Sequence, residues 1–142
     1  MRSAAQSKSR DMMEAKHSGR AKVLLVEDEA LISEMIGEAL SDSGFQVCKA
    51  ANANQALEHL AEGFEPDVLF TDIGLPGDMD GSLLAFAARR LRPGLPVVYA
   101  SAAWDALSNI RTVPGSVFVP KPYSPRNICS LLTRLISAPA AA

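Results

Sequence analysis

The feature that most constrains the fold is an alternation of short apolar runs with longer amphipathic segments. The apolar runs are Val23–Val26, Gln46–Ala50, Val68–Thr71, Val97–Ala100 and Val117–Val119. All but the second are nearly continuous, which is typical of strands that are buried on both faces of a parallel sheet. The sequence therefore predicts five short strands, separated by connections long enough to hold helices.

Four of the intervening segments place apolar residues at helical spacing. These faces are Ile32–Leu40, Ala53–Ala61, Leu84–Leu91 and Ile128–Ile136. Gly44 and Gly63 are suited to ending the first two helices, and Ser124-Pro125 is suited to beginning the last. A further helix is expected within Ala102–Pro114. The predicted fold is a doubly wound α/β domain, with helices on both faces of one parallel sheet.

Length and composition fit a single globular domain. The chain has 142 residues, of which 48% are hydrophobic and 21% charged. No apolar run approaches the roughly 20 residues that span a membrane, and the first residues lack the apolar core of a signal peptide. We therefore expect a cytoplasmic protein without a membrane segment. Cys48 and Cys129 are too few for a disulfide framework and are expected to be small buried residues.

The charge is unevenly distributed along the chain. Residues 1–20 carry a net charge of +3 and the remainder carries −5, which gives −2 in total. The basic stretch has little hydrophobic periodicity, so we expect residues 1–20 to form a disordered extension, residues 21–137 the domain, and residues 138–142 a short tail. An acidic domain argues against nucleic acid as a direct partner, because binding to the phosphate backbone needs a basic face.

Polar side chains follow four of the five predicted strands. Glu27 and Asp28 follow the first strand, Asp72 the third, Ser101 the fourth and Lys121 the fifth. The carboxyl ends of parallel strands meet at one edge of the sheet, where ligands bind in folds of this kind. We therefore expect these side chains to converge, although they lie far apart in the sequence.

The residue types at this edge suggest a metal-dependent phosphoryl site. Clustered carboxylates call for a cation, and Mg²⁺ prefers oxygen ligands of this kind. No His or Cys stands at these strand ends, which argues against zinc. An ammonium group and a hydroxyl suit the oxygens of a phosphoryl group, and a central carboxylate can act as a nucleophile to form an aspartyl phosphate.

Four stretches, VLLVEDE, VLFTDIGLPGDMDG, LPVVYASA and VFVPKP, resemble the receiver domain of two-component response regulators. The resemblance covers about residues 21–137. It implies a flavodoxin-like receiver fold with strand order 2-1-3-4-5. One departure is the loop Pro76–Gly81, which is one residue longer than the commonest family form.

The resemblance also implies a role for each residue at the strand ends. Asp72 would be the phosphoacceptor and, with Asp28, a direct Mg²⁺ ligand. The backbone carbonyl of Gly74 would be the third protein ligand, and Glu27 would act mostly through metal-bound water. Lys121 would pair with the phosphoryl oxygens, and Lys121-Pro122 matches the cis peptide of the family.

Two further residues match the switch positions of the family. Ser101 would be drawn toward the phosphoryl group, and the ring of Phe118 would then turn inward. Phe118 lacks the hydroxyl of the tyrosine often found at that position. Small residues at Gly74 and Ala103 leave the predicted site sterically open, which suggests faster loss of the phosphoryl group.

The resulting functional prediction is a stand-alone receiver in a two-component phosphorelay rather than an enzyme. Its own chemistry would be limited to self-phosphorylation from a donor and autodephosphorylation. A sensor histidine kinase or a histidine phosphotransfer protein would supply the phosphoryl group. Few residues follow the last helix, so the output is expected to be binding to a downstream protein, on a face near Trp104, Val113 and Tyr123. The family uses that face for partners or for homodimers.

Three alternatives were weighed against this prediction. Phosphatases of the haloacid dehalogenase type use a strand-end Asp with Mg²⁺, and Toprim-like nucleic-acid enzymes pair a strand-end Glu with Asp-x-Asp. Both patterns require an acid two residues after Asp72, where this chain has Gly74. A receiver-like adaptor that is never phosphorylated is the third alternative, and the full set of site residues disfavours it.

Overall fold

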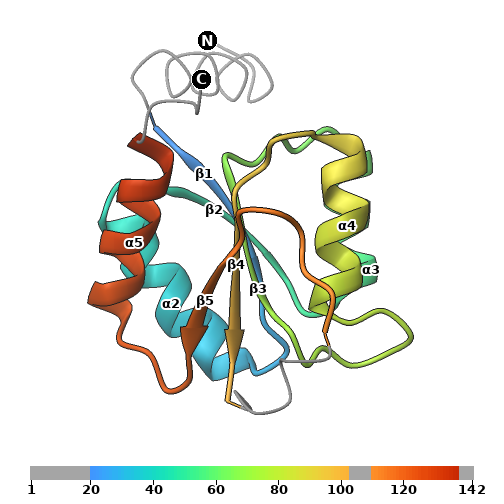
Figure 1. Cartoon of the computed structure of the whole chain (residues 1–142). Coiled ribbons are helices and arrows are strands. Elements are labelled where there is room, and N and C mark those ends of the chain that lie inside the picture. The colour runs from blue at the N-terminus through green and yellow to red at the C-terminus, as the bar shows by residue number, and fades with distance from the viewer. Residues whose placement is uncertain (1–19, 103–109, 138–142) are drawn as a thin grey trace, which may run out of the picture.

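The computed structural model describes residues 20–102 and 110–137 (Figure 1). Within these residues, five parallel strands form one sheet in the order β2-β1-β3-β4-β5. The strands are β1 (Lys22–Val26), β2 (Gln46–Ala50), β3 (Val68–Asp72), β4 (Val97–Ser101) and β5 (Val117–Pro120). The predicted strands agree with these bounds to within one residue at each end, so the doubly wound fold and the strand order are confirmed.

Four helices of the described residues cover the two faces of the sheet. They are α2 (Ala30–Asp42), α3 (Ala53–Ala61), α4 (Gly81–Leu91) and α5 (Pro125–Ser137). Helices α2 and α5 pack together on one face, and α3 and α4 pack together on the other (Figure 1). None of these helices is long and apolar enough to cross a bilayer.

Several sequence predictions fall in parts of the chain that are not described. The expected helix within Ala102–Pro114 is not present at residues 110–114, which are irregular. Residues 103–109, with Ala103 and Trp104, lie outside the described residues. The same holds for most of the predicted extension at residues 1–20 and for the tail at 138–142, so both stay predictions.

The core has two layers, one on each side of the sheet. Along β1, Leu24 and Val26 face α3 and α4, whereas Val23 and Leu25 face α2 and α5. Every residue of β3 and β4 is buried, because these strands are covered on both faces and paired on both edges. The continuous apolar runs in the sequence reflect this double burial.

The two edge strands and the helix surfaces are less well covered. Most residues of β2 and β5 are only half-buried. Cys48, on β2, and Cys129, on α5, are likewise half-buried, so the prediction that both are buried is wrong. Their positions explain the difference, because an edge strand and an outer helix each have a side that no other element covers.

Parallel pairing carries the strand ends to one edge of the sheet. Val26 of β1 is opposite Thr71 of β3, and Asp72 is opposite Ala100 of β4. At the next strand, Ser101 is opposite Pro120. The residues that follow these positions therefore lie at the same edge, as the sequence predicted.

Candidate functional site

Three carboxylates meet where β1 and β3 end. Oxygen atoms of Glu27, Asp28 and Asp72 all lie within 4.8 Å of one another. Glu27 and Asp72 are buried, with 3% and 8% of their surface exposed, whereas Asp28 is exposed. The cluster therefore has two buried carboxylates and one that is exposed to solvent.

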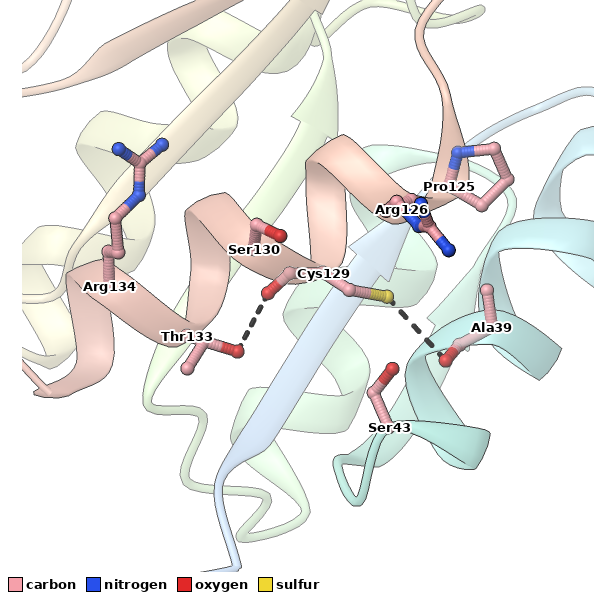
Figure 2. A pocket seen from close by; sticks show the side chains of 8 residues that line it. All are labelled: Ala39, Ser43, Pro125, Arg126, Cys129, Ser130, Thr133 and Arg134. Carbon is pink, nitrogen blue, oxygen red and sulfur yellow. Dashed lines mark hydrogen bonds between the residues drawn. The ribbon is translucent and has the colours of Figure 1, made fainter.

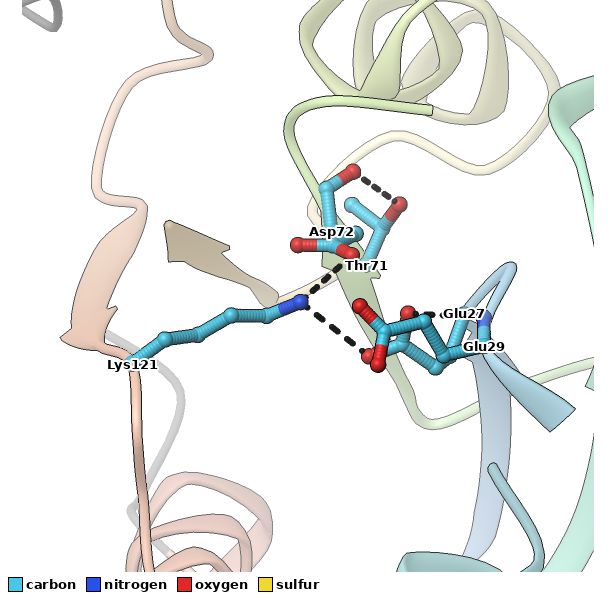
Figure 3. A network of polar contacts seen from close by, with 5 residues as sticks. All are labelled: Glu27, Glu29, Thr71, Asp72 and Lys121. Carbon is cyan, nitrogen blue, oxygen red and sulfur yellow. Dashed lines mark hydrogen bonds and ion pairs between the residues drawn. The ribbon is translucent and has the colours of Figure 1, made fainter. Parts of the chain in front are cut away.

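Lys121 follows the edge strand β5, and its side chain reaches across to the carboxylates (Figure 3). Its Nζ lies 2.7 Å from Asp72 Oδ2 and 3.3 Å from Glu27 Oε1. The backbone of Lys121 is fixed as well, since its N–H donates to the carbonyl oxygen of Ser101 at 3.0 Å. The Lys121-Pro122 peptide bond is cis, as the resemblance implied.

Burial and like charge shift the ionisation of this cluster. Burial, the hydrogen bond with Asp72 and the negative charge of Asp72 together raise the pKa of Glu27 to about 7, and burial contributes most. Burial opposes the charge of Lys121, but the hydrogen bond and the charge of Asp72 outweigh it, so the pKa of Lys121 is raised. One ammonium group thus pairs with two of the three acidic side chains.

The donor set fits a hard divalent cation. All three acidic residues offer oxygen, which Mg²⁺ prefers, and two carboxylates are close enough to raise the pKa of one of them. A cation would relieve the repulsion that Lys121 balances only in part. Glu27, Asp28 and Asp72 are therefore suited to holding Mg²⁺, as the sequence predicted.

The backbone around Asp72 is tightly packed. The buried hydroxyl of Thr71 donates to the carbonyl oxygen of Asp72 at 2.9 Å. A Cβ atom on Gly81, the first residue of α4, would collide with that same carbonyl oxygen. Asp80 caps α4 by accepting a hydrogen bond from the Leu83 amide at 3.0 Å. The start of α4 therefore presses against the end of β3, and this requires glycine.

The loop after Asp72 is open to solvent. Gly74 is exposed, and a Cβ atom placed there would meet no atom within 4 Å outside its chain neighbours. A groove of about 390 Å³ begins at Glu27 and Asp28 and runs between α2, β2 and α3. This groove gives access to Glu27 and Asp28, and Asp72 does not line it.

The two predicted switch residues lie at different depths along β4 and β5. Ser101 is buried at the end of β4. It pairs with Pro120 of β5, the residue before the cis peptide Lys121-Pro122. The half-buried ring of Phe118 packs on the ring of Tyr99, with centroids 5.2 Å apart. The structure brings Ser101 to the edge with the carboxylates and places Phe118 further down the sheet.

The partner face was predicted near three residues, and the structure buries one of them. Val113 is only 2% exposed, because its side chain joins the core and its amide donates to the Tyr99 hydroxyl. Tyr123 is half-buried, with its ring 5.4 Å from that of Phe70. Trp104 lies outside the described residues. Of the two described residues, Tyr123 is the one placed where a partner could reach it.

A separate groove of about 690 Å³ lies between α2 and α5 (Figure 2). The thiol of Cys129 donates to the carbonyl oxygen of Ala39 at 3.5 Å within it, and the Thr133 hydroxyl donates to the Cys129 carbonyl at 2.7 Å. None of the strand-end residues lines this groove. It is therefore not part of the acidic site.

The sequence reasoning missed two side chains that shape this region, Thr71 and Tyr99. Each has a buried hydroxyl that bonds to backbone, at Asp72 and at Val113 respectively. The available signal was a polar side chain within an otherwise apolar strand, since a buried hydroxyl usually has a hydrogen-bond partner.

Comparison with known proteins identifies a family. The family model for the response regulator receiver domain matches residues 23–133. The chain is 34% identical over 124 residues to the sensor kinase CckA of Brucella abortus. This match covers 84% of this chain and 13% of that protein. It is 31% identical over 118 residues to the phosphate regulon transcriptional regulatory protein PhoB of Pseudomonas aeruginosa, covering 80% of this chain and 51% of that protein.

Solved structures agree with these matches. A response regulator receiver protein from Sinorhizobium medicae superposes with a TM-score of 0.74 at 31% identity, covering 84% of this chain and 96% of that one. The chain thus spans nearly all of a solved receiver, but only 13% to 51% of the two curated relatives. The likeness concerns the receiver and not the other parts of those longer proteins.

Proposed function

The chain belongs to the response regulator receiver domain family, and we propose that it accepts a phosphoryl group on Asp72 and thereby changes its binding to a partner protein. The observation that carries this proposal is the contact between Lys121 and Asp72 inside the carboxylate cluster. It provides a nucleophile, a fixed positive charge and a cation site within a few ångströms.

Glu27, Asp28 and Asp72 would hold Mg²⁺, together with the backbone carbonyl of Gly74. When bound, the ion neutralises negative charge on phosphoryl oxygens and so lowers the barrier to their approach. The pKa of about 7 for Glu27 supports this assignment, since the cluster carries more acid than Lys121 can balance.

Asp72 would act as the nucleophile. One of its carboxylate oxygens attacks the phosphorus of the donor, a P–O bond forms, and the bond between phosphorus and the leaving group breaks. Lys121 already lies 2.7 Å from Asp72 and is positioned to pair with the oxygens of the incoming group. The hydroxyl of Ser101, at the same edge, would then donate to a phosphoryl oxygen.

The donor would be a sensor histidine kinase or a histidine phosphotransfer protein. Receiver domains are signalling domains rather than conventional enzymes, and they interact with histidine kinases and effectors. New charge at Asp72 would draw Ser101 toward the phosphoryl group and shift the population of conformations around β4 and β5. A downstream protein would read that shift, and action as a stand-alone unit stays a prediction.

Intact mass measurement with acetyl phosphate and Mg²⁺ tests the proposal. The protein is expected to gain the mass of one phosphoryl group in the presence of Mg²⁺. Asp72→Asn should abolish the gain, whereas Asp78→Asn, which changes an exposed acid in the same loop, should preserve it. Fluorescence of Trp104, the only tryptophan of the chain, provides a second readout in the same samples.

The outcomes separate phosphorylation from a binding-only role. A gain that persists in Asp72→Asn would assign the phosphoryl group to another residue. A protein that gains no mass and does not bind Mg²⁺ would be an adaptor with a receiver fold, and the phosphoacceptor proposal would be abandoned.

A further inference from the structure

A phenol hydroxyl sits at the centre of the fold with a long-range backbone partner. Tyr99, in the middle of β4, is fully buried, and its hydroxyl accepts a hydrogen bond from the Val113 amide at 3.2 Å. Val113 belongs to residues 110–116, which lead into β5 and are called the β5 approach below. The hydroxyl thus satisfies a buried backbone amide, which a phenylalanine at this position could not do.

The β5 approach is also held from the side of α4. The guanidinium of Arg89 donates to the carbonyl oxygen of Leu95 at 2.9 Å and, through a second nitrogen, to the carbonyl oxygen of Pro114. Arg111 adds a weaker contact, with its guanidinium 5.8 Å from the centre of the Phe86 ring. Side chains from β4 and α4 thus fix an irregular segment that makes no strand pairing of its own.

Tyr99 is close to the acidic site through the paired strands. It lies two residues before Ser101 on β4, and its ring packs on that of Phe118, its register partner on β5. Three residues after Phe118, the amide of Lys121 bonds to the Ser101 carbonyl, and its Nζ contacts Asp72. A short span of two paired strands therefore connects the Tyr99 hydroxyl with the carboxylate cluster.

We infer that Tyr99 is a positioning residue whose hydroxyl ties the β5 approach to β4, so that the state of the acidic site sets the position of that segment. The inference rests on the proposed phosphorylation of Asp72. A displacement of β4 or β5 at the site reaches Val113 through the Tyr99 ring and hydroxyl. The surface formed by the β5 approach then differs between the two states of the protein.

Hydrogen–deuterium exchange combined with intact mass tests this inference. Wild type and Tyr99→Phe are each incubated with Mg²⁺, with and without acetyl phosphate, and the mass gain is recorded in the same samples. In wild type, amide exchange across residues 110–119 should change by about threefold or more on phosphorylation. In Tyr99→Phe, baseline exchange there should rise, and the response to phosphorylation should disappear. Thr133→Val, which removes a hydroxyl from the outer helix α5, should keep the wild-type response.

A merely structural role predicts a different result. Tyr99→Phe would then raise baseline exchange but keep the phosphorylation response, and this outcome would overturn the inference. A normal mass gain without any change at residues 110–119 in wild type would also overturn it and leave the proposed function intact. Absence of the mass gain in wild type would refute the proposed function, and the inference with it.

A second variant keeps the test decisive if Tyr99→Phe does not fold. Arg89→Met releases the β5 approach from α4 and leaves Tyr99 itself unchanged, although it also removes the hydrogen bond from Arg89 to the Leu95 carbonyl. It should weaken the phosphorylation response at residues 110–119 while the mass gain is retained. A response equal to that of wild type would count against the coupling.

Discussion

Lys121 and Asp72 lie 49 residues apart in the sequence, yet their side chains meet at 2.7 Å across the carboxyl edge of the sheet. Glu27 shares the same ammonium group at 3.3 Å. One cation thus holds two buried carboxylates that would otherwise repel each other. The consequences of this arrangement can be measured separately for charge, proton binding and backbone packing.

Replacement of Lys121 should impair phosphorylation and stability together. Lys121→Met keeps the length of the side chain but leaves Asp72 and Glu27 without their counter-charge. We expect phosphoryl incorporation from acetyl phosphate to fall about tenfold or more, and the metal-free protein to lose about 2 kcal/mol. Mass spectrometry and urea unfolding measure the two effects. Lys49→Met, at an exposed lysine beside the site, serves as the control, and equal losses in both variants would contradict the prediction.

The stability of the metal-free protein should fall as the pH rises. The pKa of Glu27 is raised by burial from 4.5 to about 7 on folding, so the folded state binds a proton more tightly than the unfolded chain does. This contribution is fully present below the unfolded value and is lost as the pH rises through about 7. Urea unfolding in EDTA should show a loss on the order of 1–3 kcal/mol between about pH 5 and pH 8.

Two comparisons isolate Glu27 in that experiment. Glu27→Gln should flatten the pH dependence, whereas Glu29→Gln, at an exposed neighbour, should leave it in place. Mg²⁺ should restore stability at the high-pH end, because ionised carboxylates bind it better. A pH profile that is the same in Glu27→Gln and in wild type would assign the effect to other groups.

Gly81 should tolerate no side chain. In Gly81→Ala the added methyl group would meet the Asp72 carbonyl, so either α4 or the end of β3 must move. We expect a loss of about 1–3 kcal/mol in urea unfolding and weaker Mg²⁺ binding, since Asp72 shifts with its backbone. Gly74→Ala, where the methyl group meets open space, should change stability by only about 0.5 kcal/mol. Similar losses at the two glycines would refute the close approach.

A side chain at Gly74 should prolong the life of the phosphoryl group. This position is exposed and open, two residues after the phosphoacceptor candidate. Gly74→Gln would place a side chain beside the site and hinder the water that hydrolyses an aspartyl phosphate. We expect the lifetime of the phosphorylated protein to increase by about twofold or more. Mass spectrometry at intervals after removal of the donor measures this lifetime. An unchanged or shorter lifetime would show that access at this side does not limit hydrolysis.

Much of the fold could be predicted because local pattern and tertiary role coincide. The strands β3 and β4 are buried on both faces, and their apolar runs are unbroken for that reason. The site residues were predictable from the same geometry, since Asp72 and Lys121 follow strands whose ends must share one edge. The strand order, by contrast, came from the resemblance to receiver domains and not from the local pattern.

The errors have a common physical origin in contacts between distant segments. Val113 was predicted to lie near a partner face, but its amide and side chain turn inward to Tyr99, 14 residues earlier. Cys48 reads as buried, but its strand lies at an edge of the sheet. The interrupted apolar run of β2 is consistent with its edge position, but no local pattern reveals which amide a buried hydroxyl will meet.

The sheet also determines what a binding measurement on this protein reports. Residues at the ends of β1, β3, β4 and β5 form one cluster, and each strand is fixed by hydrogen bonds to its neighbour. The cluster therefore exists only while four strands remain in register. If the chain is cleaved within residues 110–116, Asp72 stays on the N-terminal fragment and Lys121 on the C-terminal one. The two side chains then meet only while the fragments remain associated. Mg²⁺ titration is thus an assay of cooperative folding as much as of ligand affinity.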